Sequence, residues 1–227
     1  MLPEKLRALF RGANHETATG ESARARRSTP EGKEEILTRG SRGLEQFFTS
    51  IRDQTGLTLL DLGGANQDNI NFITNLGHRL YSEDFLRTLR DTFGSEDPND
   101  QGNSGQIEHF LNQNLEYPDQ QFDAVLVWDV LEYLGPALLA ATVERLHSVI
   151  RPGGYLLAFF HADERLSYVP YYNFRIRDIN QLQVSQRGSR QPAHLFNNRS
   201  LEKLFQRFES VKFFLTREHL REIIVRR

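Results

Sequence analysis

The chain alternates between two patterns of apolar residues. Short apolar runs of strand length occur at 57–63, 78–84, 123–129 and 151–161. Apolar residues recur at helical spacing in other segments, at 44–54, 69–77, 85–93 and 137–150. Strands that alternate with helices in this order predict a parallel sheet joined by right-handed crossovers.

The C-terminal part of the chain follows a different pattern. A helical segment, 200–208, precedes two strand-like runs at 211–216 and 221–227, and the link between these runs is so short that they must pair antiparallel. The segment 162–198 mixes aromatic residues, arginines and glycine without a clean period, and we interpret it as an insertion on the substrate side. The segment 106–115 fits a helix or a strand.

Residues 1–40 are rich in Arg, Glu, Ser, Thr and Gly and have no sustained apolar face. This composition predicts a mostly disordered polar tail, followed by one domain over 41–227. The basic cluster of Arg24, Arg26 and Arg27 is flanked by acidic residues, which favours a solvated tail over a phosphate-binding one.

Composition narrows the class of protein. The 227 residues suffice for one α/β domain with a sizeable core. The absence of cysteine excludes disulfides, thiol nucleophiles and cysteine-bound zinc, and no His, Asp or Glu cluster has metal-ligand spacing. No apolar run approaches the roughly 18 residues that span a membrane, and the N-terminus is too polar for a secretory signal, so we expect a cytoplasmic protein. The net charge of −2 gives no general reason to expect a nucleic-acid partner.

The turn "LLDLGGAN" at 59–66 is the first strand-to-helix connection, and ligands of open parallel sheets bind at such connections. A dinucleotide would require G-x-G-x-x-G, which is missing here, and Asp68 would repel its phosphate. A cationic nucleoside without phosphate, S-adenosylmethionine, suits the turn better. Asp61 can attract its cationic part, and Asp84, 23 positions later, or the adjacent Glu83 can bind its ribose.

Four motifs in order, "LLDLGGAN", "LYSEDF", "FDAVLVWDVLEYL" and "IRPGGYLLAFF", resemble those of class I S-adenosylmethionine-dependent methyltransferases, over roughly 44–161. The resemblance implies an α/β, Rossmann-like fold with a seven-stranded, mostly parallel sheet, an antiparallel last strand and helices on both faces. It also implies the cofactor S-adenosylmethionine, bound by Asp61, Gly63, Gly64, Ala65, Asp84, Asn114, Leu115 and Trp128. Ala65 replaces the usual second glycine, and asparagines replace an acidic residue near the adenine position of Asn114 and Leu115.

Two residues at strand ends are candidates for catalysis. His161 closes the last parallel strand and could act as a general base, although a partly exposed histidine without a role is the other interpretation. Asp129 could orient an amine or a hydroxyl, or it could cap a helix that starts near Leu131. Glu132 and Tyr133 follow in that helix, where they could face solvent or a lid.

The insertion is the best candidate for acceptor recognition, because long connections after core strands usually carry function. The candidate substrate-binding residues are Tyr133, Tyr168, Tyr171, Tyr172 and Arg175. The same aromatic residues could instead form a packed flap or the contact of a homodimer. Arg187 and Arg190 are expected in an exposed turn.

The sequence therefore favours an active methyltransferase that acts by in-line displacement on a small-molecule acceptor. A methyltransferase-fold protein without activity, which binds a protein partner through the aromatic insertion, is the alternative. Methylation of nucleic acid has only the three tail arginines in its favour, and we regard it as the weakest hypothesis.

Overall fold

The computed structural model describes residues 36–94, 97–162, 167–216 and 220–227. The chain divides into two compact units, 1–33 and 34–227, and the first unit lies outside the described residues. The predicted disorder of 1–35 therefore stays a prediction.

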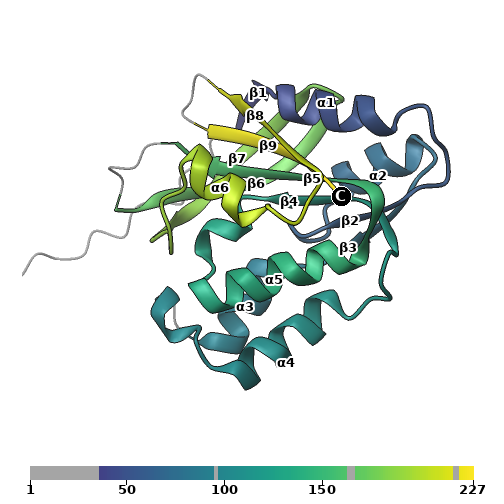
Figure 1. Cartoon of the computed structure of the whole chain (residues 1–227). Coiled ribbons are helices and arrows are strands. Elements are labelled where there is room, and N and C mark those ends of the chain that lie inside the picture. Colours follow the sequence, from purple (N-terminus) through teal and green to yellow (C-terminus); the bar gives the residue numbers. More distant parts are fainter. Residues whose placement is uncertain (1–35, 95–96, 163–166, 217–219) are drawn as a thin grey trace, which may run out of the picture. The chain divides into compact units, whose positions relative to one another are not determined.

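A twisted sheet of six strands forms the centre of the domain (Figure 1). In spatial order its strands are β3 (Arg79–Ser82), β2 (Thr58–Asp61), β4 (Phe122–Trp128), β5 (Ile150–His161), β9 (Leu220–Arg226) and β8 (Ser210–Leu215). The first four strands pair in parallel, whereas β9 pairs antiparallel with both β5 and β8. The mostly parallel α/β sheet with an antiparallel last strand is thus confirmed.

The main sheet has six strands in the described part of the chain, where the sequence predicted seven. The ambiguous segment 106–115 belongs to α4 (Ser104–Leu115), a helix that begins after Asn103, whose side chain accepts a hydrogen bond from the Gln106 amide. Four of the ten residues at 106–115 are Asn or Gln, which are depleted in strands or neutral there. The sheet consequently ends at β3.

Helices cover both faces of the sheet (Figure 1). One face carries α1 (Arg42–Ile51) and α2 (Gln67–Asn75). The opposite face carries α3 (Phe85–Phe93), α4, α5 (Pro136–Val149) and α6 (Asn198–Leu204). Two short 3-10 helices, η3 (Pro98–Asp100) and η4 (Val130–Tyr133), lie in the connections.

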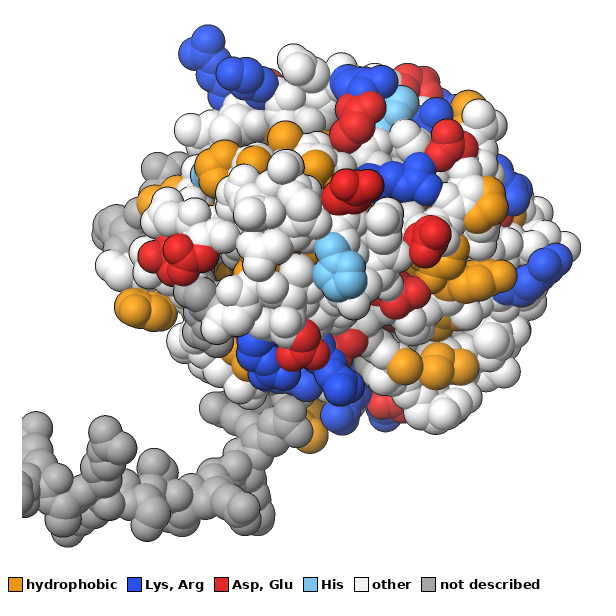
Figure 2. Space-filling view, turned by 90° about the horizontal axis from the view of Figure 1, so that it is seen from below, with side chains coloured by type: hydrophobic (Ala, Val, Ile, Leu, Met, Phe, Trp, Pro, Cys, Tyr) orange, Lys and Arg blue, Asp and Glu red, His pale blue; other side chains and the backbone are white. Residues whose placement is uncertain are grey.

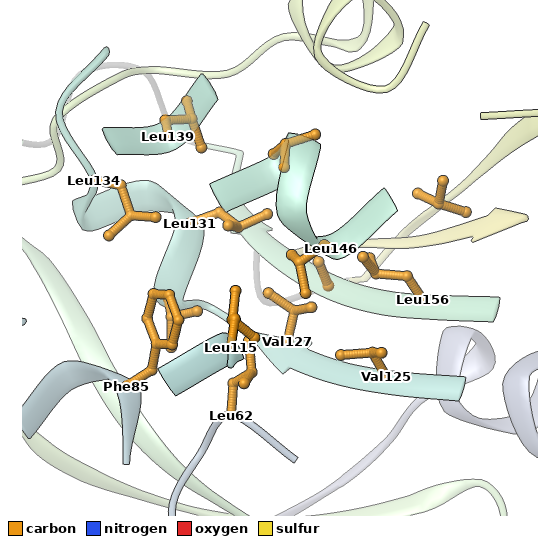
Figure 3. Close-up of a cluster of buried hydrophobic side chains, with 14 of the residues drawn as sticks. Leu62, Phe85, Leu115, Val125, Val127, Leu131, Leu134, Leu139, Leu146 and Leu156 are labelled. Atoms are coloured by element: carbon orange, nitrogen blue, oxygen red, sulfur yellow. The ribbon is translucent and has the colours of Figure 1, made fainter. Parts of the chain in front are cut away.

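Strand alternation separates the core into two clusters, one on each face. Val125 and Val127 of β4 point toward α5, where they meet Leu146 and other buried leucines (Figure 3). Ala124, Leu126 and Trp128 point to the other face, toward α1. Each fully buried Leu or Phe stabilises the fold by roughly 1.5–3 kcal/mol.

The predicted insertion forms a hairpin that belongs to a second, three-stranded sheet. Its strands are β6 (Val169–Asp178) and β7 (Gln181–Arg190), and β1 (Ile36–Gly40) pairs antiparallel with β7 in the order β1-β7-β6. Residues 36–40 were assigned to the disordered tail, and this assignment was wrong. These residues form a strand because they pair with β7, almost 150 residues away, and a local sequence pattern cannot show such a pairing.

Charged side chains of both signs are interspersed over the face shown in Figure 2, instead of forming one continuous basic stripe. Within the described ranges, no helix is long and apolar enough to cross a membrane. Over the same ranges, no group of three or more His, Asp or Glu side chains could hold a metal ion.

Candidate active site

The predicted glycine turn lies at the carboxyl end of β2, as expected. Gly63 donates a backbone hydrogen bond to Asp61 Oδ1 over 2.8 Å, and Gly64 has a positive φ of 86°, which glycine adopts without strain. A Cβ on Gly63 would lie 2.7 Å from Cδ1 of Trp128, so the indole ring requires glycine there. Asn66 then caps α2 by accepting from the Asn69 amide.

Asp61 is fully buried and bonded only to protein groups. Its Oδ1 also accepts from Trp128 Nε1 over 2.6 Å, and its Oδ2 accepts from Asn69 Nδ2 over 3.0 Å. Burial raises the pKa of the Asp61 carboxyl, while these bonds act in the opposite direction. In this arrangement Asp61 organises the turn, and its predicted contact with a cationic ligand stays a prediction.

Asp84 is the better of the two acidic candidates for a ribose contact. It caps α3, because its Oδ1 accepts from the Arg87 amide over 3.1 Å, and it pairs with Gly63 in an isolated backbone bridge. The neighbouring Glu83 accepts a hydrogen bond from the Tyr117 hydroxyl. Glu83 is therefore engaged elsewhere, whereas Asp84 lies at the glycine turn.

The structure does not bring Asn114 and Leu115 to this turn. Both are buried in α4, where Asn114 Nδ2 donates to the Phe110 carbonyl over 2.8 Å and Leu115 packs into the core (Figure 3). Neither residue lines the cavity at the turn. Their adenine contact was inferred from their position just before β4, and in the structure the last turn of α4 occupies that position and points both side chains inward.

The cavity at the carboxyl ends of the strands is small in this arrangement. It measures about 20 Å³ and is lined by Leu62, Gly63, Asp84, Leu86, Trp128, Asp129, Val130, Tyr172, Phe174 and Arg187. Trp128 forms one wall of the cavity, where its fully buried ring stacks on Phe174 with centroids 5.0 Å apart and planes 5° apart. Sites for ligands of cofactor size measure roughly 300–1,000 Å³.

Two asparagines at the start of α2 hold strand β6 over this cavity. Asn66 Nδ2 and Asn69 Nδ2 both donate to the Phe174 carbonyl, over 3.0 and 3.1 Å. Asn69 Oδ1 accepts from the Ile176 amide over 2.7 Å. We call these three hydrogen bonds the α2–β6 latch. The hairpin of the insertion thus closes the site through the same helix that follows the glycine turn.

A second group of polar side chains lies buried where β4 and β5 end. Glu132, on η4, accepts from the His161 backbone amide through Oε1, and its Oε2 lies 2.6 Å from His161 Nδ1. The interpretation that Glu132 faces solvent was wrong, because its side chain is only 2% exposed. The short 3-10 helix turns Glu132 inward, toward the end of β5.

Asp129 belongs to the same group. Its Oδ2 accepts from the Tyr172 amide over 3.2 Å and from the Tyr133 hydroxyl over 3.5 Å. The capping interpretation was wrong, because the Asp129 side chain makes no capping hydrogen bond to η4. Burial, followed by the charge of Glu132, raises the pKa of Asp129 to about 7.

His161 has intermediate burial, with 10% of its side chain exposed. Burial lowers the pKa of His161, but the hydrogen bond and charge of Glu132 outweigh burial, so the pKa is raised. The Tyr172 ring stacks against the imidazole with centroids 6.2 Å apart. The Nε2 atom of His161 is buried and has no hydrogen-bond partner among the described residues.

The insertion does not form the continuous aromatic wall that the sequence suggested. Tyr172 reaches the cavity, but Tyr168 is 63% exposed, and Tyr171 lies under the Arg190 guanidinium at 5.0 Å. Arg175 alternates with Phe174 along β6, so it lies on the opposite face of the strand.

Tyr133 is buried within the polar group beside Asp129. The two arginines expected in an exposed turn are both part of β7. Arg190 is 8% exposed, and Arg187 lines the cavity beside a shift in the β6–β7 register. Arg187 is exposed, as expected, but it lies on a strand and not in a turn, whereas Arg190 is buried and the expectation for it was wrong. The position of Arg187 at a register shift leaves no local signal in the sequence.

A family model described as "Methyltransferase domain" matches residues 33–209 of the chain. The match covers most of the chain, and the protein belongs to this family of S-adenosylmethionine-dependent methyltransferases. A search of curated proteins found no match.

Comparison with solved structures finds similar chains at low sequence identity. The Burkholderia thailandensis 1,6-didemethyltoxoflavin-N1-methyltransferase, bound to 1,6-didemethyltoxoflavin and S-adenosylhomocysteine, is 14% identical with a TM-score of 0.46, over 82% of this chain and 76% of that one. A Methanosarcina mazei SAM-dependent methyltransferase is 15% identical with a TM-score of 0.44, over 77% and 93% of the two chains. The glycopeptide N-methyltransferase MtfA is 14% identical with a TM-score of 0.44, over 82% and 95%.

The polar groups at the glycine turn have the chemistry to bind S-adenosylmethionine, but the cavity beside them is too small to hold it. Asp84 uses Oδ1 for its cap, so within the described residues Oδ2 can accept from a ribose hydroxyl. The cavity of about 20 Å³, however, is far too small for the cofactor while Trp128 and Phe174 are stacked. The described arrangement is a closed one.

Proposed function

We propose that the protein methylates a small molecule at an atom that loses a proton during the reaction. The observation that carries this proposal is the buried group of Asp129, Glu132 and His161, which lies at the carboxyl ends of β4 and β5 near the glycine turn. A sheet edge that holds both a cofactor turn and titratable side chains is typical of an active site.

Each residue has a defined task in this proposal. S-adenosylmethionine, when bound, supplies an electrophilic methyl group on a positively charged sulfur. Asp84 accepts from the ribose hydroxyls, and the backbone at Gly63 and Gly64 allows close approach. Arg187 places a positive charge at the same cavity, which suits a carboxylate.

The protein provides mainly orientation and exclusion of water, since the methyl group is already activated. Asp129 orients the acceptor, and its carboxyl is about half protonated near neutral pH, so it can donate or accept a hydrogen bond. His161 accepts the acceptor's proton through Nε2. Release of the α2–β6 latch would open the space for both ligands.

A small acceptor is favoured over a nucleic acid by two features. The group around Asp129 and His161 is enclosed by the hairpin, and Tyr172 covers it. The formal net charge of −2 gives no general excess of positive charge for binding a phosphate backbone. A cytoplasmic location and a homodimer stay predictions from the sequence.

An acceptor screen tests this proposal. The purified protein is incubated with S-adenosylmethionine and pools of small phenols, amines and carboxylic acids, and S-adenosylhomocysteine release is followed by mass spectrometry. We expect the wild-type protein to release S-adenosylhomocysteine only when one of the pools is present. The His161→Gln protein should release less of it with the same pool. Wild-type protein that binds the cofactor but releases product equally with and without every pool would contradict a small-molecule acceptor.

One observation favours a second function, that of an inactive methyltransferase-fold protein that binds a protein partner. The fully buried Trp128–Phe174 stack fills the cofactor space. If that stack never opens, the wild-type protein will bind neither S-adenosylmethionine nor S-adenosylhomocysteine. A single turnover above background would exclude this second function.

A further inference from the structure

The two carboxylate oxygens of Glu132 contact two different atoms of His161. Oε1 accepts from the His161 backbone amide, and Oε2 lies 2.6 Å from the imidazole Nδ1. The backbone contact alone would suffice to fix the end of β5 against η4. The second contact holds the imidazole ring, and it leaves Nε2 as the nitrogen without a partner among the described residues.

We propose that Glu132 is a positioning residue that holds His161 in the Nδ1–H tautomer, so that the Nε2 lone pair is free to take a proton from the methyl acceptor. This inference rests on the proposed function and deepens it. A carboxylate accepts only, so an ionised Glu132 requires a proton on Nδ1. A buried carboxylate that orients a histidine in this way also stabilises the imidazolium that forms when the proton arrives.

The proton and electron count of the step is simple. The acceptor atom bonds to the methyl carbon, the methyl–sulfur bond breaks, and its electron pair stays on sulfur. The acceptor's proton moves to Nε2 of His161. The positive charge that left the sulfur is then on the imidazolium, next to the Glu132 carboxylate.

Charged groups from several elements surround the pair. Asp129, at the end of β4, favours the protonated imidazole, whereas Arg39 of β1 disfavours it. Tyr172 of β6 covers the ring. Burial raises the pKa of Glu132, while the hydrogen bonds and charge of His161, and then the charge of Arg221 of β9, act in the opposite direction and favour its ionised form. Glu132 is the only one of these groups within hydrogen-bond distance of the imidazole in the described part of the chain.

Nuclear magnetic resonance of ¹⁵N-labelled imidazoles tests the tautomer without any acceptor. His161→Gln assigns the signal by its loss. In the wild-type protein above the His161 pKa, we expect a protonated Nδ1 and a bare Nε2. A neutral His161 with its proton on Nε2 would overturn the proposal, because Glu132 would then hold its own proton.

Glu132→Gln gives the sharper comparison, since its carbonyl oxygen can still accept from the His161 amide. Its NH₂ group would face Nδ1 and donate to it, so we expect the tautomer to invert and the His161 pKa to fall. Glu144→Gln, which removes an exposed acid on α5, is the matched control and should change neither. An unchanged tautomer and pKa in a folded Glu132→Gln protein would overturn the proposal.

Kinetics on the first acceptor from the screen extends the test to the reaction. In the wild type, kcat should rise with pH through the His161 pKa, because the neutral imidazole is the base. In Glu132→Gln we expect kcat to fall by about 10²-fold or more, with KM for S-adenosylmethionine nearly unchanged. Equal kcat and the same pH profile in both proteins would overturn the inference.

Cofactor binding separates this inference from the proposed function. If S-adenosylhomocysteine binds the wild type and Glu132→Gln equally, a loss of rate belongs to the positioning of His161. If it binds neither protein, the proposed function fails, while the imidazole signals still decide whether Glu132 sets the tautomer.

Discussion

Asp129 is a carboxyl group in a place where its charged form is disfavoured. Its Oδ2 accepts hydrogen bonds from the Tyr172 amide and the Tyr133 hydroxyl, but the carboxyl is fully buried and the acidic Glu132 is nearby. The pKa of about 7 compares with an ordinary value of 3.8. The folded protein therefore takes up a proton on Asp129 at a higher pH than the unfolded chain does.

This difference predicts a pH dependence of stability. Between about pH 4 and 7 the folded state binds the proton and the unfolded state does not, so the contribution of Asp129 to the free energy of unfolding falls as pH rises. The Asp129→Asn substitution should remove this decrease in the free energy of unfolding. We expect the variant to gain on the order of 1–4 kcal/mol relative to wild type between pH 4 and pH 8. Urea unfolding of both proteins at several pH values measures the difference, and two parallel curves would contradict it.

Residue positions were predictable where they followed from a strand end. Asp61, Gly63, Asp84 and Trp128 were placed near one another because parallel strands end on the same edge of the sheet. Glu132 was missed, because its inward direction depends on a 3-10 helix whose polar residue meets β5 only in the folded chain.

At the scale of elements, the proposed function requires the α2–β6 latch to release before the cofactor can bind. A ligand that binds only the open arrangement has its affinity reduced by the fraction of closed protein. Weakening the latch should therefore tighten cofactor binding, provided that the glycine turn stays intact.

Asn66→Ser is the variant that tests the latch. Serine can still cap α2, but it cannot reach the Phe174 carbonyl. One hydrogen bond contributes about 0.5–1.5 kcal/mol, so we expect S-adenosylhomocysteine to bind roughly 2- to 10-fold more tightly. Asn71→Ser, on the exposed side of the same helix, is the control. Calorimetric titration measures both variants, and unchanged or weaker binding in Asn66→Ser would show that the latch does not compete with the cofactor.

The order of the main elements could be predicted because the apolar residues of each element recur at the spacing of a helix or a strand. The strands and helices between β2 and β5 follow strong local patterns, and so does the closing β8–β9 pair. The insertion was placed on the substrate side from its sequence, but strand β1 and the hydrogen bonds between the hairpin and α2 could not be predicted. Both depend on contacts between distant segments, such as Ile36 with Ser185 and Asn69 with Ile176.

At the scale of the whole domain, two sheets meet at one functional edge. The six-stranded sheet supplies the glycine turn, Asp84 and the Glu132–His161 pair, and the three-stranded sheet supplies the cover. Family membership establishes the methyltransferase domain, and the cavity at the glycine turn is lined by Gly63 and by residues of both sheets, among them Trp128 and Tyr172. The central claim is that this edge binds S-adenosylmethionine and its product.

Calorimetric titration of S-adenosylhomocysteine into the wild type and Asp84→Asn tests that claim most directly. Asparagine caps a helix as well as aspartate does, so α3 should stay intact while the negative charge at the ribose position is lost. Asp91→Asn, which removes an exposed charge from the same helix, is the control. We expect wild-type binding with a Kd on the order of micromolar, weakened about 10-fold or more in Asp84→Asn and unchanged in Asp91→Asn. Absence of binding to both the wild type and Asn66→Ser would contradict the claim and favour the inactive, protein-binding function.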